Sequence, residues 1–508
     1  MDRSAAGSGP GRIDPEFTAY PLRELAAAAL ERAAGLGAGH ADFRAERITQ
    51  QQIGLSDGQL ETLVDTEDLG LAVRVVVDGT WGFAAAVDLT AEAAASAAVR
   101  AVEVARVAAA LSTERIELAA EPAHGDVSWV SAYDQDPFGV SAAEKIELLG
   151  GWSSGLLASD RVDHVDASLL QVKECKFYSD GATTATQQRV RVHPELTAVA
   201  VEPGGRFETM RTLAPPAGRG YEYLTGTGWD FPAELAELPE LLAARLAAPA
   251  VRAGRYDLVI DPSNLFLTIH ESIGHATELD RALGYEAACA GTSFATLDQL
   301  GRLQYGSPVM HVTGDRTVPH GLATIGYDDE GVAAQSWDLI GGGVLTGYQL
   351  DRRMARMEGF GRSNGCAFAD SPGHMPIQRM ANVSLQPAPD GPSVAGLIAG
   401  VEHGIYVVGD KSWSIDMQRY NFQFTGQRFY EISHGRLAGQ LRDVAYQATT
   451  TDFWNSVAAV GGPQTYLLGG AFNCGKGQPS QVAPVSPGCP AVLVRGLRIL
   501  NAAQEAQT

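Results

Sequence analysis

Residues 71–86 read LAVRVVVDGTWGFAAA and predict two antiparallel strands joined by a tight turn. Asp78 and Gly79 separate the two apolar runs, and this pair favours the backbone twist of a two-residue hairpin. An alanine-rich stretch follows at 90–111, with apolar residues at helical spacing and Thr90 in the capping position. Strands followed by a helix that covers one face indicate an α+β layer.

The rest of the chain extends this pattern into two domains. A chain of 508 residues is too long for one small core. The stretch 203–230 is rich in glycine and proline and predicts a boundary. From about residue 305 onward, short strands alternate with glycine turns, which is typical of a large antiparallel β domain. We therefore expect a flexible leader at 1–20 and an N-terminal α+β domain of helices and a sheet at 21–230. A large, mostly antiparallel β domain that carries the His-Glu-x-x-x-His helix is expected at 231–508.

The composition excludes several classes of protein. Apolar residues make up 45% and charged residues 19% of the chain, which is a globular composition. The formal charge of −22 opposes binding to nucleic acid, and the sequence has no basic patch to offset it. No apolar run is long enough to predict a membrane span, and the N-terminus lacks the apolar core of an export signal. The five cysteines are too few for a disulfide framework and favour a reducing cytoplasm.

The segment NLFLTIHESIGHATELDRALG, residues 264–284, contains the pattern His-Glu-x-x-x-His. We expect a helix here, capped by Ser263 or Asn264 after a predicted strand and turn. On a regular helix His270 and His275 lie about 140° apart around the axis, so they do not share a face. The pattern then describes only a helix with polar side chains.

A single π-bulge changes the geometry of this pair. Such a bulge makes residues five apart behave like residues four apart, and it is frequent at functional sites. Gly274 tolerates a backbone irregularity just before the second histidine. Both imidazoles can then face one metal ion, with Glu271 beside its bound water. Zinc needs one more protein ligand, either Glu278 or a distant thiolate such as Cys474.

Cys474 lies in NCGKG, a glycine-rich turn that predicts exposed backbone N–H groups. These groups and the charge of Lys476 are expected to favour the thiolate form, which binds metal. The same stretch also reads G-x-x-x-x-G-K, but no serine or threonine and no helix follows, so a nucleotide site is not expected. Gly151 to Gly155 match G-x-S-x-G but follow a helical pattern, which favours a helix over a nucleophile elbow.

Several segments in the same order resemble the TldD/PmbA family of metallopeptidases, in particular its catalytic TldD-like branch. The segments are ADFRAE, SDGQLETLV, GLAVRVVVDGTWGFA, HESIGHATELD, DRRMARMEGFGRSNG, PIQRMANVSLQP, GDKSWSIDMQRYNFQF and NCGKGQPSQVAPV. The resemblance spans roughly residues 22–500. It implies a cytoplasmic enzyme that acts as a homodimer or as a heterodimer with a TldE/PmbA-like paralogue.

The resemblance also implies the site. Zinc is held by His270, His275 and Cys474, and Glu271 is the general base that assists attack of zinc-bound water on a peptide bond. The expected substrates are small or unfolded peptides, including leader peptides or peptide-like natural-product precursors. Two alternatives stay open: an amide hydrolase or condensing enzyme of a small-molecule pathway that uses the same zinc site, and a scaffold subunit with structural zinc.

Four further side chains in the family-like segments are candidates for substrate binding. Arginine pairs with carboxylates in bidentate fashion, and asparagine can hydrogen-bond a peptide backbone. Folding roles are equally compatible with these positions. The candidates are Arg362, Asn364, Arg379 and Asn382.

Overall fold

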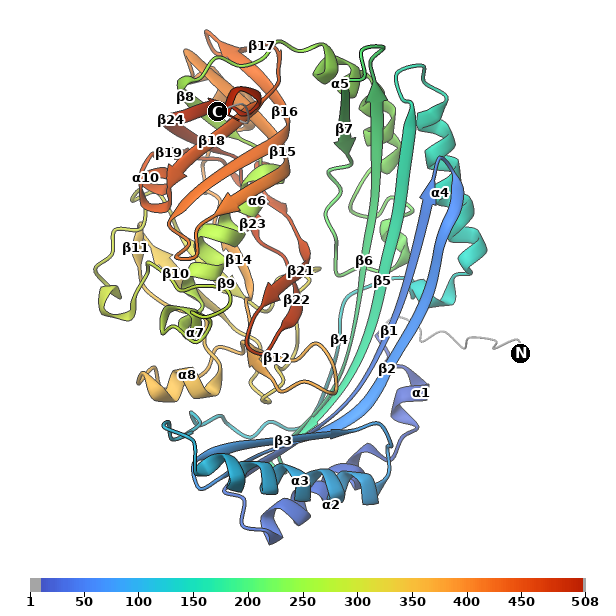
Figure 1. Ribbon diagram of the computed structural model, residues 1–508, viewed down its shortest axis with the longest axis vertical. Helices are drawn as coiled ribbons and strands as arrows, with labels where there is room; N and C mark the ends of the chain where they lie inside the picture. Colours follow the sequence, from blue (N-terminus) through green and yellow to red (C-terminus); the bar gives the residue numbers. More distant parts are fainter. Residues whose placement is uncertain (1–10, 506–508) are drawn as a thin grey trace.

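The computed structural model describes residues 11–505, which form two bodies that lie side by side (Figure 1). Long curved strands of the N-terminal sheet stand beside a C-terminal body of shorter strands, with α2 and α3 at one end of the sheet. Most strand pairs in both bodies are antiparallel, so the expected α+β class is confirmed. None of the helices within the described residues is long and apolar enough to span a membrane.

The N-terminal sheet has the strand order β3-β2-β1-β5-β6-β4, with β7 on the far side of β6. The hairpin at Asp78 and Gly79 is confirmed, and both residues have positive φ values of 50° and 75°. The strands are β1 His40–Ser56, β2 Gln59–Val77, β3 Thr80–Ala86, β4 Gly125–Val130, β5 His164–Ser179, β6 Thr183–Val201 and β7 Phe207–Arg211. The helices are α1 Pro15–Thr18, α2 Leu22–Gly35, α3 Ala91–Ala109, η1 Pro137–Gly139, α4 Ala142–Leu157, η2 Tyr221–Tyr223 and α5 Phe231–Ala247.

Small side chains let α3 approach the sheet closely. The helix is capped by Thr90, as expected, and buries a row of alanines. A Cβ atom at Gly82 of β3 would overlap the carbonyl oxygen of Ala101 at 1.9 Å. Because the helix and strand are in contact along their backbones, only glycine fits at this position.

Two parts of the chain bear on the expected boundaries, which stay a prediction. Residues 1–10 of the expected leader lie outside the described residues, but from Pro15 the chain forms α1 and Phe17 is fully buried. Helix α5 packs with Phe231 and Leu238 in the core between the N-terminal sheet and α4. The boundary expected at 230 would separate α5 from this core. A boundary near residue 250 keeps them together.

The C-terminal body contains two sheets of six and seven strands, ordered β11-β10-β9-β14-β23-β20 and β15-β8-β24-β18-β16-β17, with β19 added to β24. Its strands are β8 Gly254–Ile260, β9 Val312–Asp315, β10 Ser336–Gly341, β11 Val344–Leu345, β12 Ala367–Phe368, β13 Ile377–Gln378, β14 Asn382–Leu385, β15 His403–Ile415, β16 Asn421–Ser433, β17 Arg436–Leu441, β18 Val444–Thr449, β19 Val457–Val460, β20 Leu467–Leu468, β21 Ala471–Lys476, β22 Gln481–Val485, β23 Gly488–Cys489 and β24 Val492–Asn501. Its helices are α6 Pro262–Ile269, η3 His270–Gly274, η4 His275–Thr277, α7 Leu279–Ala282, η5 Leu297–Gln299, α8 Arg352–Met357, α9 Val394–Ala399, α10 Thr450–Asn455, η6 Pro463–Thr465 and α11 Ala502–Glu505. The largest apolar cluster of the chain surrounds α6 and fixes its position.

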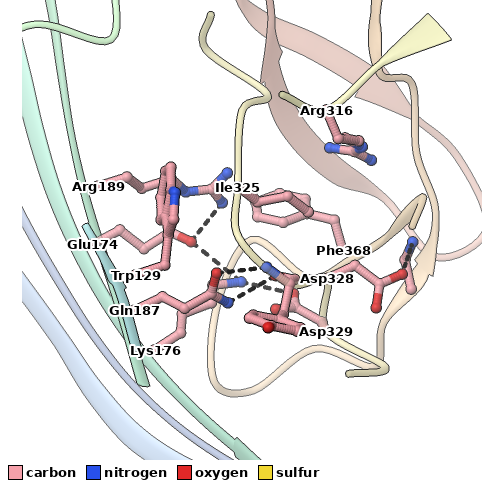
Figure 2. Close-up of a pocket in the computed structure, with 12 residues that line it drawn as sticks. Trp129, Glu174, Lys176, Gln187, Arg189, Arg316, Ile325, Asp328, Asp329 and Phe368 are labelled. Atoms are coloured by element: carbon pink, nitrogen blue, oxygen red, sulfur yellow. Dashed lines mark hydrogen bonds and ion pairs between the residues drawn. The ribbon is translucent and has the colours of Figure 1, made fainter. Parts of the chain in front are cut away.

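Buried ion pairs join the two bodies around a small cavity (Figure 2). Lys176 of β5 donates to Asp329 of the C-terminal body at 2.7 Å, and its ammonium group lies 4.3 Å from the centroid of the Phe368 ring. Arg189 approaches the same ring and donates to Glu174 at 2.6 Å. Because these charges are buried and paired, they hold the sheet against the C-terminal body in one register.

Candidate metal centre

Helix α6 places the motif at the centre of the C-terminal body. Asp261 caps the helix by accepting a hydrogen bond from the Ser263 N–H at 3.0 Å, and Pro262 fills the first helical position. The expected caps, Ser263 and Asn264, are therefore wrong, because both residues lie inside the helix. The Asn264 side chain instead donates to the carbonyls of Gly409 and Thr425, which ties α6 to the β15–β16 hairpin.

The expected π-bulge is confirmed, because residues His270–Gly274 form a π-helical turn. Such a turn disturbs the regular hydrogen bonding of the backbone, and neighbouring side chains supply donors to its carbonyls. Tyr305 donates to the Ser272 carbonyl, and Gln349 donates to the Gly274 carbonyl at 2.6 Å. The His270 and His275 rings come together with their centroids 4.7 Å apart.

Gly274 serves this turn for a different reason from the one expected. Its φ of −54° is available to any residue, so backbone freedom is not needed. A Cβ atom at this position would lie 2.6 Å from the sulfur of Met380. The glycine is required because Met380 packs directly on the helix backbone.

The Cys474 side chain, from strand β21, lies close to the two histidines. One ligand atom from each of the three residues lies within 4.8 Å of the others, and all three side chains are buried. The Cys474 Sγ atom lies 3.6 Å from Nε2 of His275. The Nδ1 atom of His270 is buried and has no hydrogen-bond partner in the structure. A thiolate with two imidazoles is a donor set that suits zinc, so the residues present fit this ion.

Glu278 orients the site and is not part of the ligand group. Its Oε2 atom lies 2.8 Å from Nδ1 of His275, and its Oε1 atom accepts from Lys476 at 3.2 Å. A carboxylate on Nδ1 leaves Nε2 of His275 free to face the thiol. Lys476 also contacts Asp280 at 2.8 Å and Glu286 at 3.6 Å. Three carboxylates therefore offset the positive charge of Lys476, which we had expected to favour the Cys474 thiolate.

The imidazoles control the charge state of the thiol. Burial raises the pKa of Cys474, but the nearby His275 and His270 outweigh burial and hold that pKa well below its ordinary value. Burial lowers the pKa of His275, while Cys474 and Glu278 raise it to a net value of about 9. The two imidazoles therefore favour the thiolate form of Cys474, which is the form of cysteine that binds metal.

Glu271 lies beside the ligands and is held by Arg419, a residue that sequence reasoning had not assigned. Arg419 donates to its Oε2 atom at 2.5 Å. Burial raises the pKa of Glu271, whereas His275, His270 and Arg419 lower it, and the net result is a lowered pKa. Arg419 has a φ of +63°, which is uncommon for a residue with a side chain. Its position in the family-like segment GDKSWSIDMQRYNFQF was the sequence signal for this residue.

The four candidates for substrate binding are engaged in structural contacts. Arg379 donates to the carbonyls of Cys474 and Gln481 and so clamps β21 to β22. Arg362 forms a bidentate pair with Glu121 near the surface. Asn364 and Asn382 are buried, and both their oxygen and nitrogen atoms bond to neighbouring loops. These contacts give each of the four side chains a role in the fold, and their expected role in substrate binding stays a prediction.

The remaining motifs have ordinary surroundings. Gly151 to Gly155 lie within α4, where Ser153 donates to the Leu149 carbonyl at 2.9 Å, so the helical interpretation is confirmed. Lys476 is buried in strand β21 among carboxylates, where a phosphate would be repelled. Neither place has the geometry of the site that its pattern resembles.

Comparison with known proteins shows the family of the chain. Residues 253–501 match the family model for the PmbA/TldA metallopeptidase C-terminal domain, and residues 41–105 match the model for domain 1 of the same family. A metalloprotease of Methanothermobacter thermautotrophicus is 28% identical, over 91% of this chain and 95% of its own length. A zinc metalloprotease TldD homolog of Saccharolobus solfataricus is 22% identical, over 92% and 98%.

Solved structures share the fold. A candidate modulator of DNA gyrase from Bacteroides thetaiotaomicron superposes with a TM-score of 0.70 at 17% identity, over 94% of this chain and 98% of that one. TldE from Thermococcus kodakarensis gives a TM-score of 0.67 at 14% identity, over 92% and 98%. Both family models describe domains of one family of metallopeptidases. The chain belongs to the TldD/PmbA family.

Proposed function

We propose that this chain is a zinc-dependent peptidase that hydrolyses small or unfolded peptides. His270, His275 and Cys474 would hold the ion. When bound, zinc would supply a Lewis acid that acidifies water and polarises a carbonyl group. Glu271 takes a proton from the attacking water and delivers it to the leaving amine.

One observation carries this proposal: an imidazole and a thiol 199 positions apart meet at 3.6 Å in the interior. The three potential ligands are buried close together, and the buried Nδ1 atom of His270 has no hydrogen-bond partner among the described residues. A buried polar atom without a partner costs free energy unless a ligand compensates it. The names of the relatives support the same class of protein.

The surroundings of Glu271 support its role as a base. Arg419 fixes the orientation of the carboxylate, and the lowered pKa keeps it ionised at neutral pH. An ionised carboxylate accepts protons, whereas a protonated one would not. Because Arg419 lies in the turn of the β15–β16 hairpin, that hairpin positions the base relative to the ligands.

The experiment is a metal assay joined to a cleavage assay. The purified protein is loaded with zinc, freed of excess metal, and its metal content is measured by mass spectrometry. An unstructured peptide library is then incubated with wild type, with chelator-treated protein and with Glu271→Gln. We expect one zinc per chain, chelator-sensitive cleavage, and a Glu271→Gln protein that keeps its zinc without cleaving. A metal-loaded protein that cleaves nothing, alone or with a family paralogue, supports a scaffold role and contradicts the proposal.

The partnership of the chain also remains a proposal. Family resemblance supports assembly with a second subunit, either another copy or a paralogue, and a place in the cytoplasm. The mass of the purified particle in solution distinguishes a monomer from a homodimer. A monomer that becomes active only with a paralogue would indicate a heterodimer.

A further inference from the structure

A cleft lies between the N-terminal sheet and the C-terminal body. Its volume is about 330 Å³, within the range of sites that bind small ligands. The N-terminal body contributes Leu213, and the C-terminal body contributes Phe266, Trp413, Leu467 and Phe472. We name this space the Phe472 cleft.

Two connections join the Phe472 cleft to the catalytic centre. Trp413 lines the cleft, and Arg419 of the same β15–β16 hairpin donates to the carboxylate of Glu271. Phe472 and Asn473 line the cleft, and the next residue in the chain is Cys474. Phe266 stands one helical turn before His270 on α6. A peptide whose scissile bond reaches Glu271 therefore places a neighbouring side chain at the cleft.

The walls of the cleft are firmly packed. A Cβ atom at Gly469 would lie 2.6 Å from the Phe266 ring, so the backbone packs directly on this aromatic side chain. The ring of Phe472 stacks on His193 of β6, with centroids 6.0 Å apart and an angle of 7° between planes. The N-terminal sheet thus supports the strand that carries Cys474. A fixed apolar wall binds an apolar group without a large cost in ordering.

The charged groups at the cleft are already compensated. Arg211 pairs with Asp410 at 2.5 Å and with Glu195 at 3.3 Å. Lys411 donates to the Thr209 carbonyl at 3.3 Å and lies 3.6 Å from Glu208. No unpaired charge remains to favour an acidic or basic side chain of a substrate.

The stacked histidine adds no charge either. Burial and the nearby Arg211 lower the pKa of His193 to about 4, so the ring is neutral at pH 7. A neutral ring on an aromatic face extends the apolar wall. The cleft as a whole therefore favours burial of apolar surface.

We propose that the Phe472 cleft receives an apolar side chain, aromatic by preference, from the residue next to the hydrolysed bond. The inference rests on the proposed peptidase function and specifies its substrate class. Discrimination comes from burial of an aromatic ring against Phe472, Leu213 and Trp413. A substrate with alanine or aspartate at the same position loses this burial.

Binding is tested without cleavage. The zinc-loaded Glu271→Gln protein is mixed with a peptide that carries a photoreactive benzophenone alanine, illuminated and analysed by mass spectrometry. We expect cross-links at the cleft, on residues of 211–216 or 466–473 or on Trp413. Competition by the same peptide with phenylalanine should remove these cross-links, and competition by the aspartate peptide should not. Cross-links confined to other surfaces would overturn the inference.

Activity provides the second test. Phe472→Ala is expected to lower kcat/KM for a phenylalanine peptide at least ~10-fold relative to its alanine counterpart. Because Phe472 is near Cys474, Leu213→Ala on the opposite wall repeats the test away from the metal, with zinc content measured in both variants. Phe207→Ala, on the exposed part of β7, is the matched control and should change nothing.

The outcomes separate the two proposals. If the cleft is cross-linked but no peptide is cleaved, the peptidase function fails and the cleft assignment stands. If peptides are cleaved but neither wall variant changes the preference for phenylalanine, the peptidase function stands and the cleft assignment is overturned.

Discussion

Glu278 contacts Nδ1 of His275 at 2.8 Å and thereby directs the other ring nitrogen towards Cys474. The carboxylate is fully buried, and Lys476 fixes its second oxygen. Sequence spacing made Glu278 a candidate ligand, but its carboxylate contacts the imidazole of a candidate ligand instead. Its effect on the metal is exerted through the orientation and charge of the imidazole.

Glu278→Gln is expected to lower zinc affinity roughly 10- to 100-fold, because the imidazole loses its anionic partner. Competition with a fluorescent zinc chelator measures the change. Glu402→Gln is the control, since Glu402 pairs with His434 on the surface, where both side chains are largely exposed. Equal zinc affinity in the two variants would contradict the role of Glu278.

Gly274→Ala is expected to destabilise the protein by about 1–3 kcal/mol, because the new methyl group meets the Met380 sulfur. Denaturant unfolding measures the loss, and the cost of Gly274→Ala should be smaller in a Met380→Ala background than in wild type, because the clash is then removed. Gly155→Ala is the control on α4, where no atom lies within 4 Å of an added Cβ. A Gly274→Ala protein as stable as this control would show that close packing is not the reason for the glycine.

Arg379→Met is expected to cost about 1–3 kcal/mol, because the buried carbonyls of Cys474 and Gln481 lose their donor. Arg362→Met removes an exposed pair and should cost less than about 1 kcal/mol. Unfolding and zinc content are measured for both. If Arg379→Met keeps its stability and zinc but loses peptide binding, a substrate role replaces the clamp.

Lys145→Met tests a buried cation in the N-terminal body. Burial lowers the pKa of Lys145 to about 8 in the folded state, from 10.5. The unfolded chain therefore binds more protons between these values, and the stability of wild type rises with pH in that window. The variant lacks this dependence. The free energy of unfolding of Lys145→Met relative to wild type should therefore fall by up to about 3 kcal/mol as the pH rises from below 8 towards 10.5.

Unfolding at several pH values measures this difference, with Arg23→Met as an exposed control. Gln51 keeps a hydrogen bond from Gln171 after the substitution, so no buried acceptor is left unpaired. A constant difference between wild type and Lys145→Met across the window would contradict the prediction.

Local sequence signals predicted the local structure well. The Asp78-Gly79 turn, the Thr90 cap and the bulge after Ile269 all follow from short-range geometry, and the structure confirms each. The failures came from tertiary packing. Asp261 caps α6, although Ser263 and Asn264 have a similar propensity for the N-cap position. Helix α5 joins the N-terminal core, although a glycine-rich stretch precedes it.

The metal centre was only partly accessible to sequence reasoning from the residues themselves. Spacing could not choose between Glu278 and Cys474, because a thiol two hundred positions away has no periodic relation to the helix. The glycine-rich turn had made Cys474 a candidate, the resemblance to a family chose it over Glu278, and the fold brings it to the histidines. The charge of Lys476 was misjudged because its three carboxylate partners come from a segment nearly two hundred residues earlier.

The most direct measurement is zinc K-edge X-ray absorption on the metal-loaded protein, beside Cys474→Ser. The account predicts one sulfur and two imidazole ligands per zinc in wild type, with the sulfur at about 2.3 Å. The variant should lose the sulfur shell and most of its zinc. A wild-type spectrum with no sulfur around the ion would contradict the central claim that Cys474, His270 and His275 bind one metal.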